Sequence, residues 1–168
     1  MVEADVPEEA LREPEVRSGR PRDVILVPTY VDRIGLLKPG LEAYQADLLF
    51  LIQLLKNGTP IPRRFYRSVQ GPSTDQALEE YGVMHLHLLN PSTDVLVFLM
   101  QFEDWVAILE VNNHLPFQQR PPAHLLRLHH WQGVLEARAN RLAAIAKSKA
   151  DKRADIRRRL FMSKKPTP

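Results

Sequence analysis

The stretch YGVMHLHLL, residues 81–89, places two histidines inside an apolar run. In a β-strand successive side chains point to opposite faces, so the apolar residues would enter a core while His85 and His87 stand side by side on the other face. Two imidazoles at this spacing can bind one metal ion or move protons near neutral pH. They can also be ordinary polar residues on a solvated sheet face, and the spacing alone leaves all three possibilities open.

Arginine, tyrosine and histidine side chains elsewhere in the sequence are further candidates for a functional site. Between two predicted helices, five consecutive residues carry three guanidinium groups and a phenol, a combination that no core would accept. Arginine binds phosphate through its planar fork, so this loop is a candidate phosphate site. A further histidine follows a predicted strand, on the face that also carries Glu110. The candidate residues outside the histidine pair are therefore Arg63, Arg64, Tyr66, Arg67 and His114.

Cleavage of RNA uses side chains of these types. A base removes the 2′-hydroxyl proton, an acid protonates the leaving 5′-oxygen, and cations hold the extra charge on the phosphate. Histidine performs either proton transfer, and rings such as Tyr66 or Trp105 can stack on a splayed base. This reaction needs neither a metal nor another cofactor. The same residue types also suit RNA binding without cleavage.

A metal-dependent enzyme is the third possibility. His85 and His87 would bind zinc or manganese, with His114 or Glu110 as the third ligand. The chain has no cysteine and lacks the GxxxxGK[ST], GxGxxG, GxSxG and HExxH patterns. Thiolate chemistry is thereby excluded, and ATP, dinucleotide, serine-hydrolase and zincin functions are disfavoured. The remaining histidines of the last predicted helix are expected to face solvent or the helix edges: His124, His129 and His130.

These residues depend on helices and strands that alternate along the chain. Apolar residues recur at helical spacing over 41–57 and 124–147, and a capped short helix is expected at 75–81. After Gly82 the period becomes strand-like, and short turns join three strands into an antiparallel meander. The middle strand is apolar on both faces and should be central. The expected strands are 83–89, 94–102 and 105–112, with a further apolar piece at 23–31 that Pro28 interrupts.

The fold class that follows is α+β, with N-terminal helices packed on one face of the meander, the other face left available, and a long C-terminal helix. A chain of 168 residues suits one domain, here residues 23–146. Residues 1–22 are acidic and rich in Glu, Arg and Pro, and are expected to be disordered. Residues 147–168 form a basic tail that can neutralise RNA phosphates, through Lys149, Arg153, Arg157 and Arg158.

The composition and charge of the chain limit the class of protein and its expected location. The net charge is +3 with a sequence pI of about 9.3, and the hydrophobic fraction of 44% suffices for a core. The chain has no apolar run of about 18 residues, which a membrane-spanning helix would require. The acidic N-terminus lacks the apolar stretch of a secretory signal. A cytoplasmic protein without a membrane partner is therefore expected.

Three motifs in a fixed order resemble the YafO-type toxins of the RelE/ParE toxin–antitoxin superfamily. A helix ending in KNG is followed by PRRFYRS, where Pro62, Phe65 and Arg67 match a family pattern. The HLHL motif is similar to the family's His-x-His-Leu strand. AILEVNNH at 107–114 is similar to a strand that ends in a histidine past an Ala-Ile-Leu core, and a helix with more histidines follows. The resemblance covers about residues 40–138.

The resemblance implies a compact α+β toxin with a RelE-like sheet. Such a toxin cleaves mRNA, commonly when bound at the ribosome, and is silenced by a cognate antitoxin. Two features depart from the family pattern. Tyr66 and Ser68 replace the small and acidic residues expected around the arginine. The N-terminal extension and the basic tail also exceed a minimal toxin.

The matching positions supply the candidate catalytic residues His85, His87, His114 and Arg67. We expect one imidazole of the strand to act as base, His114 as acid, and Arg67 with a neighbouring arginine to hold the phosphate. The alternative is a non-catalytic module of the same superfamily that binds a protein partner or nucleic acid. In that case the histidines are plain polar residues, and the arginine loop meets an acidic antitoxin segment.

Overall fold

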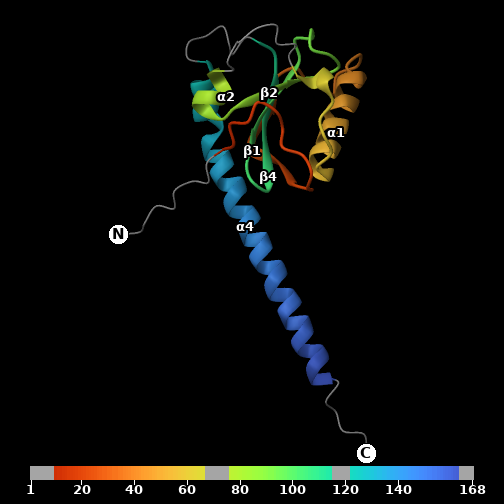
Figure 1. Ribbon diagram of the computed structural model, residues 1–168, viewed down its shortest axis with the longest axis vertical. Helices are drawn as coiled ribbons and strands as arrows, with labels where there is room; N and C mark the ends of the chain where they lie inside the picture. Colours follow the sequence, from red (N-terminus) through yellow and green to blue (C-terminus); the bar gives the residue numbers. More distant parts are fainter. Residues whose placement is uncertain (1–9, 67–75, 115–121, 163–168) are drawn as a thin grey trace, which may run out of the picture.

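The computed structural model of the chain describes residues 10–66, 76–114 and 122–162. Helices flank a four-stranded sheet, which makes the fold α+β (Figure 1). Within these ranges every helix is too short or too polar to span a membrane. The elements in chain order are β1 (Asp23–Asp32), α1 (Glu42–Asn57), the 3-10 turn η1 (Arg63–Phe65), α2 (Gln76–Tyr81), β2 (Met84–His87), β3 (Leu96–Gln101), β4 (Trp105–Asn112) and α4 (Pro122–Met162).

The sheet has the order β1-β4-β3-β2. Strands β2, β3 and β4 form the predicted antiparallel meander, and β3 is interior and fully buried, as its two apolar faces indicated. The expectation of a purely antiparallel sheet is wrong, because β1 adds beside β4 in parallel. The long segment between β1 and β4 provides the crossover that parallel pairing requires. Pro28 has no N–H to donate, and the β1–β4 register shifts between Leu26 and Val31.

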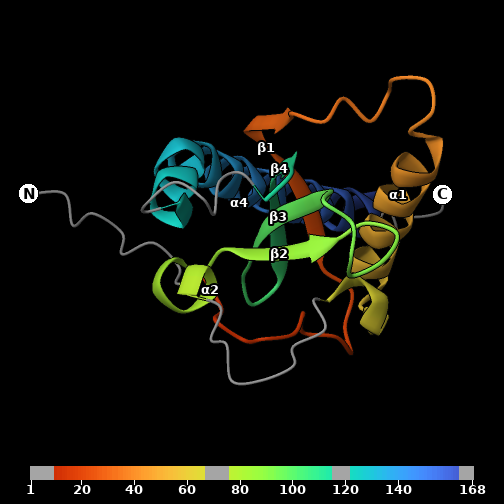
Figure 2. The ribbon, with the colours of Figure 1, turned by 90° about the horizontal axis from the view of Figure 1, so that it is seen from above.

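Both faces of the sheet are covered, so the predicted available face is not present. On one face, Leu51 and Leu55 of α1 join a core cluster with strand residues that include Leu86 and Leu99. On the opposite face, residues of α4 such as Val134 pack in a second cluster with the alternate strand residues. Figure 2 shows α1 on the side of the strands opposite α2 and the beginning of α4. His85 and His87 of β2 therefore point to the face of the sheet on which α4 packs.

Helix α1 ends where the sequence predicted, at the Asn57–Gly58 step. Gly58 adopts φ 66°, a left-handed conformation that satisfies the last carbonyl groups of the helix. A Cβ atom at this position would lie 2.0 Å from the backbone oxygen of Arg20. Glycine is therefore required both by the backbone conformation and by the segment that crosses the helix end.

The segment that precedes β1 packs against the sheet. Val16 is buried in the first cluster, and the Gln101 side chain accepts a hydrogen bond from the Arg17 N–H at 3.0 Å and donates one to the Glu15 carbonyl at 3.1 Å. The expected disorder of residues 1–22 is therefore corrected for 10–22, because a buried amide fixes this backbone. Residues 1–9 lie outside the described residues.

Helix α4 is longer than predicted, with 41 residues. Its first half packs on strands β1 and β4 of the sheet. The remainder leaves the body as a single rod (Figure 1). The basic tail expected after residue 146 continues this helix to Met162, and every residue of 146–161 is exposed. Arg141 marks the point of departure, where it pairs with Asp23 at 2.7 Å and Asp104 at 2.8 Å.

Candidate functional site

Three histidines meet at one end of the sheet, on the same face as α4 but near the opposite edge strand, β2. His85 and His87 point the same way because they are two residues apart on β2. The register pairs His87 with Leu96 and Leu96 with Asn112, so the chain that leaves β4 brings His114 to the same end. The ring centroids lie 5.7 Å apart for His85 and His87, 5.4 Å for His87 and His114, and 6.3 Å for His85 and His114.

Oxygen acceptors fix the orientation of two of these rings. Nδ1 of His87 lies 3.1 Å from the carbonyl oxygen of Thr93, which can only accept, so this nitrogen carries the proton. Nδ1 of His114 bonds the carboxylate of Asp94, and the His114 backbone N–H donates to the same oxygen at 2.8 Å. That backbone bond, followed by the imidazole bond, lowers the pKa of Asp94. In both rings the Nε2 atom therefore carries the lone pair.

Solvent reaches this histidine cluster from one side. His87 is buried, whereas His85 and His114 are half-buried. One donor nitrogen from each ring lies within 4.8 Å of the other two, so the three side chains could hold one metal ion. The arrangement also suits proton transfer, because two imidazoles that accept or release protons face the same small volume.

A buried acid that the sequence reading overlooked holds the loop beneath the cluster. Asp47 of α1 accepts the Leu89 N–H at 2.7 Å, and Arg64 donates to both Asp47 and the Leu89 carbonyl. Leu89 has a positive φ of 70°, a conformation that a non-glycine residue retains only where surrounding bonds impose it. The same loop continues to Thr93 and Asp94, so this clamp positions the acceptors of two histidines. An acid on the apolar stripe of a helix was the available signal.

One arginine of the loop has a structural role instead of the expected phosphate contact. Arg64 is engaged by Asp47 and lies over the Phe65 ring at 4.2 Å, so it is corrected from a phosphate ligand to a structural residue. Arg63 is exposed and stays a candidate. Arg67 lies outside the described residues.

The two aromatic residues expected to stack on bases pack against the core instead, Tyr66 half-buried and Trp105 fully buried. Tyr66 packs in the cluster on the α1 side, its hydroxyl accepts the Val16 N–H at 3.0 Å, and burial raises the pKa of its phenol. Trp105 is fully buried and stacks on Phe102 with ring centroids 4.3 Å apart. Both predictions fail because these large apolar rings gain more from the core than from solvent.

A second carboxylate–histidine pair lies deeper under α4. His130 is fully buried, and its ring bonds Glu110 at 3.1 Å through Nε2 and Thr29 at 3.0 Å through Nδ1. The expectation that His130 faces solvent is wrong, and its helical spacing from buried Leu126 and Val134 was the missed signal. His129 is exposed as predicted, and the side chain of His124 lies outside the described residues.

Glu110 is committed to this buried network. It accepts hydrogen bonds from His130, from Asn112 at 2.8 Å and from Arg33 at 3.1 Å. Burial acts to raise the pKa of Glu110, but the three hydrogen bonds outweigh it and the pKa is lowered. The carboxylate is therefore not available as the third metal ligand that the sequence allowed, and among the described residues His114 is the one that lies with His85 and His87.

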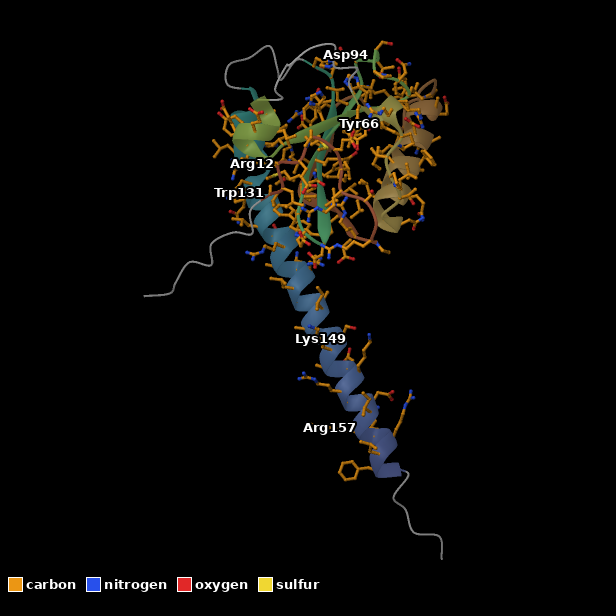
Figure 3. All side chains as sticks on the ribbon, in the orientation of Figure 1. Arg12, Tyr66, Asp94, Trp131, Lys149 and Arg157 are labelled. Carbon is orange, nitrogen blue, oxygen red and sulfur yellow. The ribbon has the colours of Figure 1, made fainter. Side chains whose placement is uncertain are left out.

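The cations of the C-terminal helix lie far from the histidines. Lys149 and Arg157 project from the protruding part of α4, whereas Asp94 lies at the opposite end of the molecule (Figure 3). All four candidate RNA contacts in this region are exposed: Lys149, Arg153, Arg157 and Arg158. They form a separate basic surface rather than a wall of the histidine cluster.

Comparisons with protein-family models, with curated proteins and with solved structures give no match. Any function must therefore be argued from the side chains themselves. The packed body carries a cluster of three imidazoles, one of them bonded to a carboxylate. The long C-terminal helix carries a separate set of basic residues.

Proposed function

We propose that this chain is an endoribonuclease that cleaves mRNA with its histidine cluster, as the resemblance to YafO-type toxins implies. The observation that carries the proposal is the convergence of His85, His87 and His114 on one volume, with His114 held by Asp94. A cognate antitoxin would silence the activity, and mRNA at the ribosome would place the protein in the cytoplasm.

The burial and the hydrogen bonds of the three rings favour a different role for each histidine in the proposed reaction. His85 is half-buried and suits the base that takes the 2′-hydroxyl proton as this oxygen attacks the adjacent phosphorus. His114 suits the acid that gives its proton to the leaving 5′-oxygen, because the bond from its Nδ1 to Asp94 orients the ring and leaves Nε2 for proton transfer. His87 is buried and its Nδ1–H is bound by Thr93, so it packs the other two rings in place.

Contacts to RNA would come from two regions. Arg63 is the exposed cation of the described part of the arginine loop, and Arg67 follows the same turn in sequence. The basic surface of α4 would hold a distant part of the same RNA, or ribosomal RNA, through phosphate neutralisation.

The test is RNA cleavage by the purified full chain in EDTA, with and without ribosomes. We expect His114→Ala and His85→Ala each to lower the rate about 100- to 10,000-fold, the range for loss of an acid or base. Asp94→Asn should lower kcat more than it changes KM, because it acts through His114. His129→Ala is the matched control and should cleave as wild type does. Absence of cleavage by wild type in both conditions would overturn the proposal.

A partner-binding module is the second candidate, and the exposed part of α4 favours it. Large apolar side chains stand among the cations on this rod: Leu142, Ile156, Leu160 and Phe161. Exposed apolar side chains that lie close together, as Ile156 and Leu160 do one turn apart, are typical of a surface that another molecule covers. The variant His85→Ala/His114→Ala separates the candidates: it should keep its partner in either case, but a ribonuclease would lose cleavage and growth arrest, whereas a binding module would lose neither effect.

A further inference from the structure

The histidine cluster has the features of a transition-metal site. Its three nitrogen donors come from two positions on β2 and one beyond β4, so the sheet holds them in a fixed relation. A tetrahedral zinc ion with Zn–N bonds of about 2.1 Å needs nitrogen atoms about 3.4 Å apart. The three donors already lie within 4.8 Å of one another, and His85 and His114 are only half-buried, so their rings could rotate toward the shorter spacing.

The acceptors behind the rings supply a second, independent observation. A metal-binding histidine typically donates its other N–H to a carboxylate or a backbone carbonyl, which fixes the tautomer and directs the lone pair. His114 does so with Asp94, and His87 does so with the Thr93 carbonyl. The loop that carries both acceptors is fixed by the Asp47 and Arg64 contacts to Leu89. Orientation of this kind is not needed for polar residues on a sheet face.

We propose that His85, His87 and His114 bind one divalent transition-metal ion of the zinc class, with a fourth position open to water. Three neutral imidazoles suit zinc, copper and nickel, whereas magnesium, calcium and manganese prefer oxygen ligands. The buried Glu110 is held by its own partners and does not contribute an oxygen.

Metal binding would also regulate the proposed cleavage reaction, and this part rests on the proposed function. A metal ion takes the lone pairs with which His85 and His114 would accept or deliver protons. The occupied cluster would therefore be inactive as a metal-independent ribonuclease, and removal of the ion would release the activity.

The experiment uses the full chain after chelation and dialysis. Titration with Zn²⁺ against a chromophoric chelator should show one equivalent bound, and Co²⁺ should give the visible spectrum of a tetrahedral site. His87→Ala and His114→Ala should each abolish stoichiometric binding. The second variant covers the case in which loss of the buried ring impairs folding. Asp94→Asn should weaken binding about 10- to 100-fold. His129→Ala and a titration with Mg²⁺ are the matched controls.

The two proposals fail in different ways. Absence of saturable Zn²⁺ binding, or equal binding by His114→Ala, overturns the metal site and leaves metal-free cleavage untouched. Stoichiometric binding by a chain that never cleaves RNA supports the metal site and removes the proposed enzyme. Cleavage that requires the ion supports the site but overturns both the inhibition and the metal-independent mechanism. Cleavage by the metal-free chain in EDTA, together with loss of cleavage when Zn²⁺ is added without EDTA, supports both proposals.

Discussion

Asp94 and Glu110 each hold a histidine, but their surroundings give the two pairs different roles. Asp94 is exposed and directs the ring of His114 toward the solvent-reached histidine cluster. Glu110 and His130 are both buried, and Thr29, Asn112 and Arg33 complete their hydrogen bonds. A pair without solvent access cannot reach a substrate, so the second pair contributes to stability and to the seating of α4.

Acid should weaken the fold through Glu110. Its pKa lies below the ordinary 4.5 in the folded chain, so the unfolded chain binds the proton more readily. The stabilisation is complete above about pH 4.5 and is lost as the pH falls through the lower folded pKa. Glu110→Gln should remove this dependence, as measured by the urea midpoint between pH 3 and 7. Exposed Glu136→Gln is the control, and parallel curves for wild type and Glu110→Gln would contradict the assignment.

At the scale of the elements, the crossing of α4 over β1 decides whether the second core cluster and the buried Glu110–His130 pair can form. Gly133 lies at this crossing, and a Cβ atom there would meet the Thr29 hydroxyl oxygen at 2.3 Å and the Thr29 Cβ at 3.2 Å. The glycine is therefore a point of close approach between a helix and a strand, not a weak point of the helix. Thr29 in turn bonds His130 one turn earlier on α4.

Gly133→Ala should destabilise the protein by about 1–3 kcal/mol, as expected when an atom is forced into a packed contact. The sign of the change in the free energy of unfolding is informative. Helix propensity alone would make alanine more stable than glycine here by about 1 kcal/mol, so a loss of stability must come from the contact with Thr29. Thermal unfolding followed by circular dichroism measures the change. Asn140→Ala, on the exposed side of the same helix, should stabilise slightly. A stabilised Gly133→Ala variant would show that α4 does not approach β1 so closely.

At the scale of the whole molecule, a packed body and an exposed helical rod carry different chemistry. Asp94, which bonds His114 of the histidine cluster, lies at one end of the body, and Lys149 and Arg157 lie along the rod that leaves the other end (Figures 1 and 3). An extended ligand such as RNA could contact both regions, whereas a small molecule could not. The separation predicts that binding and catalysis can be altered independently.

Replacement of Lys149, Arg153, Arg157 and Arg158 by alanine should weaken RNA binding without unfolding the body. Loss of four phosphate contacts should reduce the slope of log affinity against log salt by about 3, at about 0.7 per contact on a single strand. Filter binding between 50 and 200 mM salt measures the slope. The melting temperature should stay near that of wild type, because these side chains are exposed. An unchanged slope would assign the rod to a protein partner instead.

The sequence by itself determined the local elements and the pairing of histidines on one strand. Helical spacing in α1, the turn signals around the meander and the two apolar faces of β3 are properties of short stretches, so they can be read without the fold. The i, i+2 spacing likewise placed His85 and His87 on one face of β2. His114 was singled out by its position after a strand and by the motif that carries the resemblance.

Only the tertiary structure decided which side chains meet. The parallel addition of β1, the packing of α4 on β1 and β4, and the roles of Asp47, Glu110 and His130 all depend on contacts between residues far apart in the chain. The local sequence around a polar residue in an apolar stripe does not show whether its side chain faces water or a buried partner. The partner comes from another element of the fold. The polar side chain is buried only where that partner forms a hydrogen bond with it, because burial of a polar group without a partner is costly.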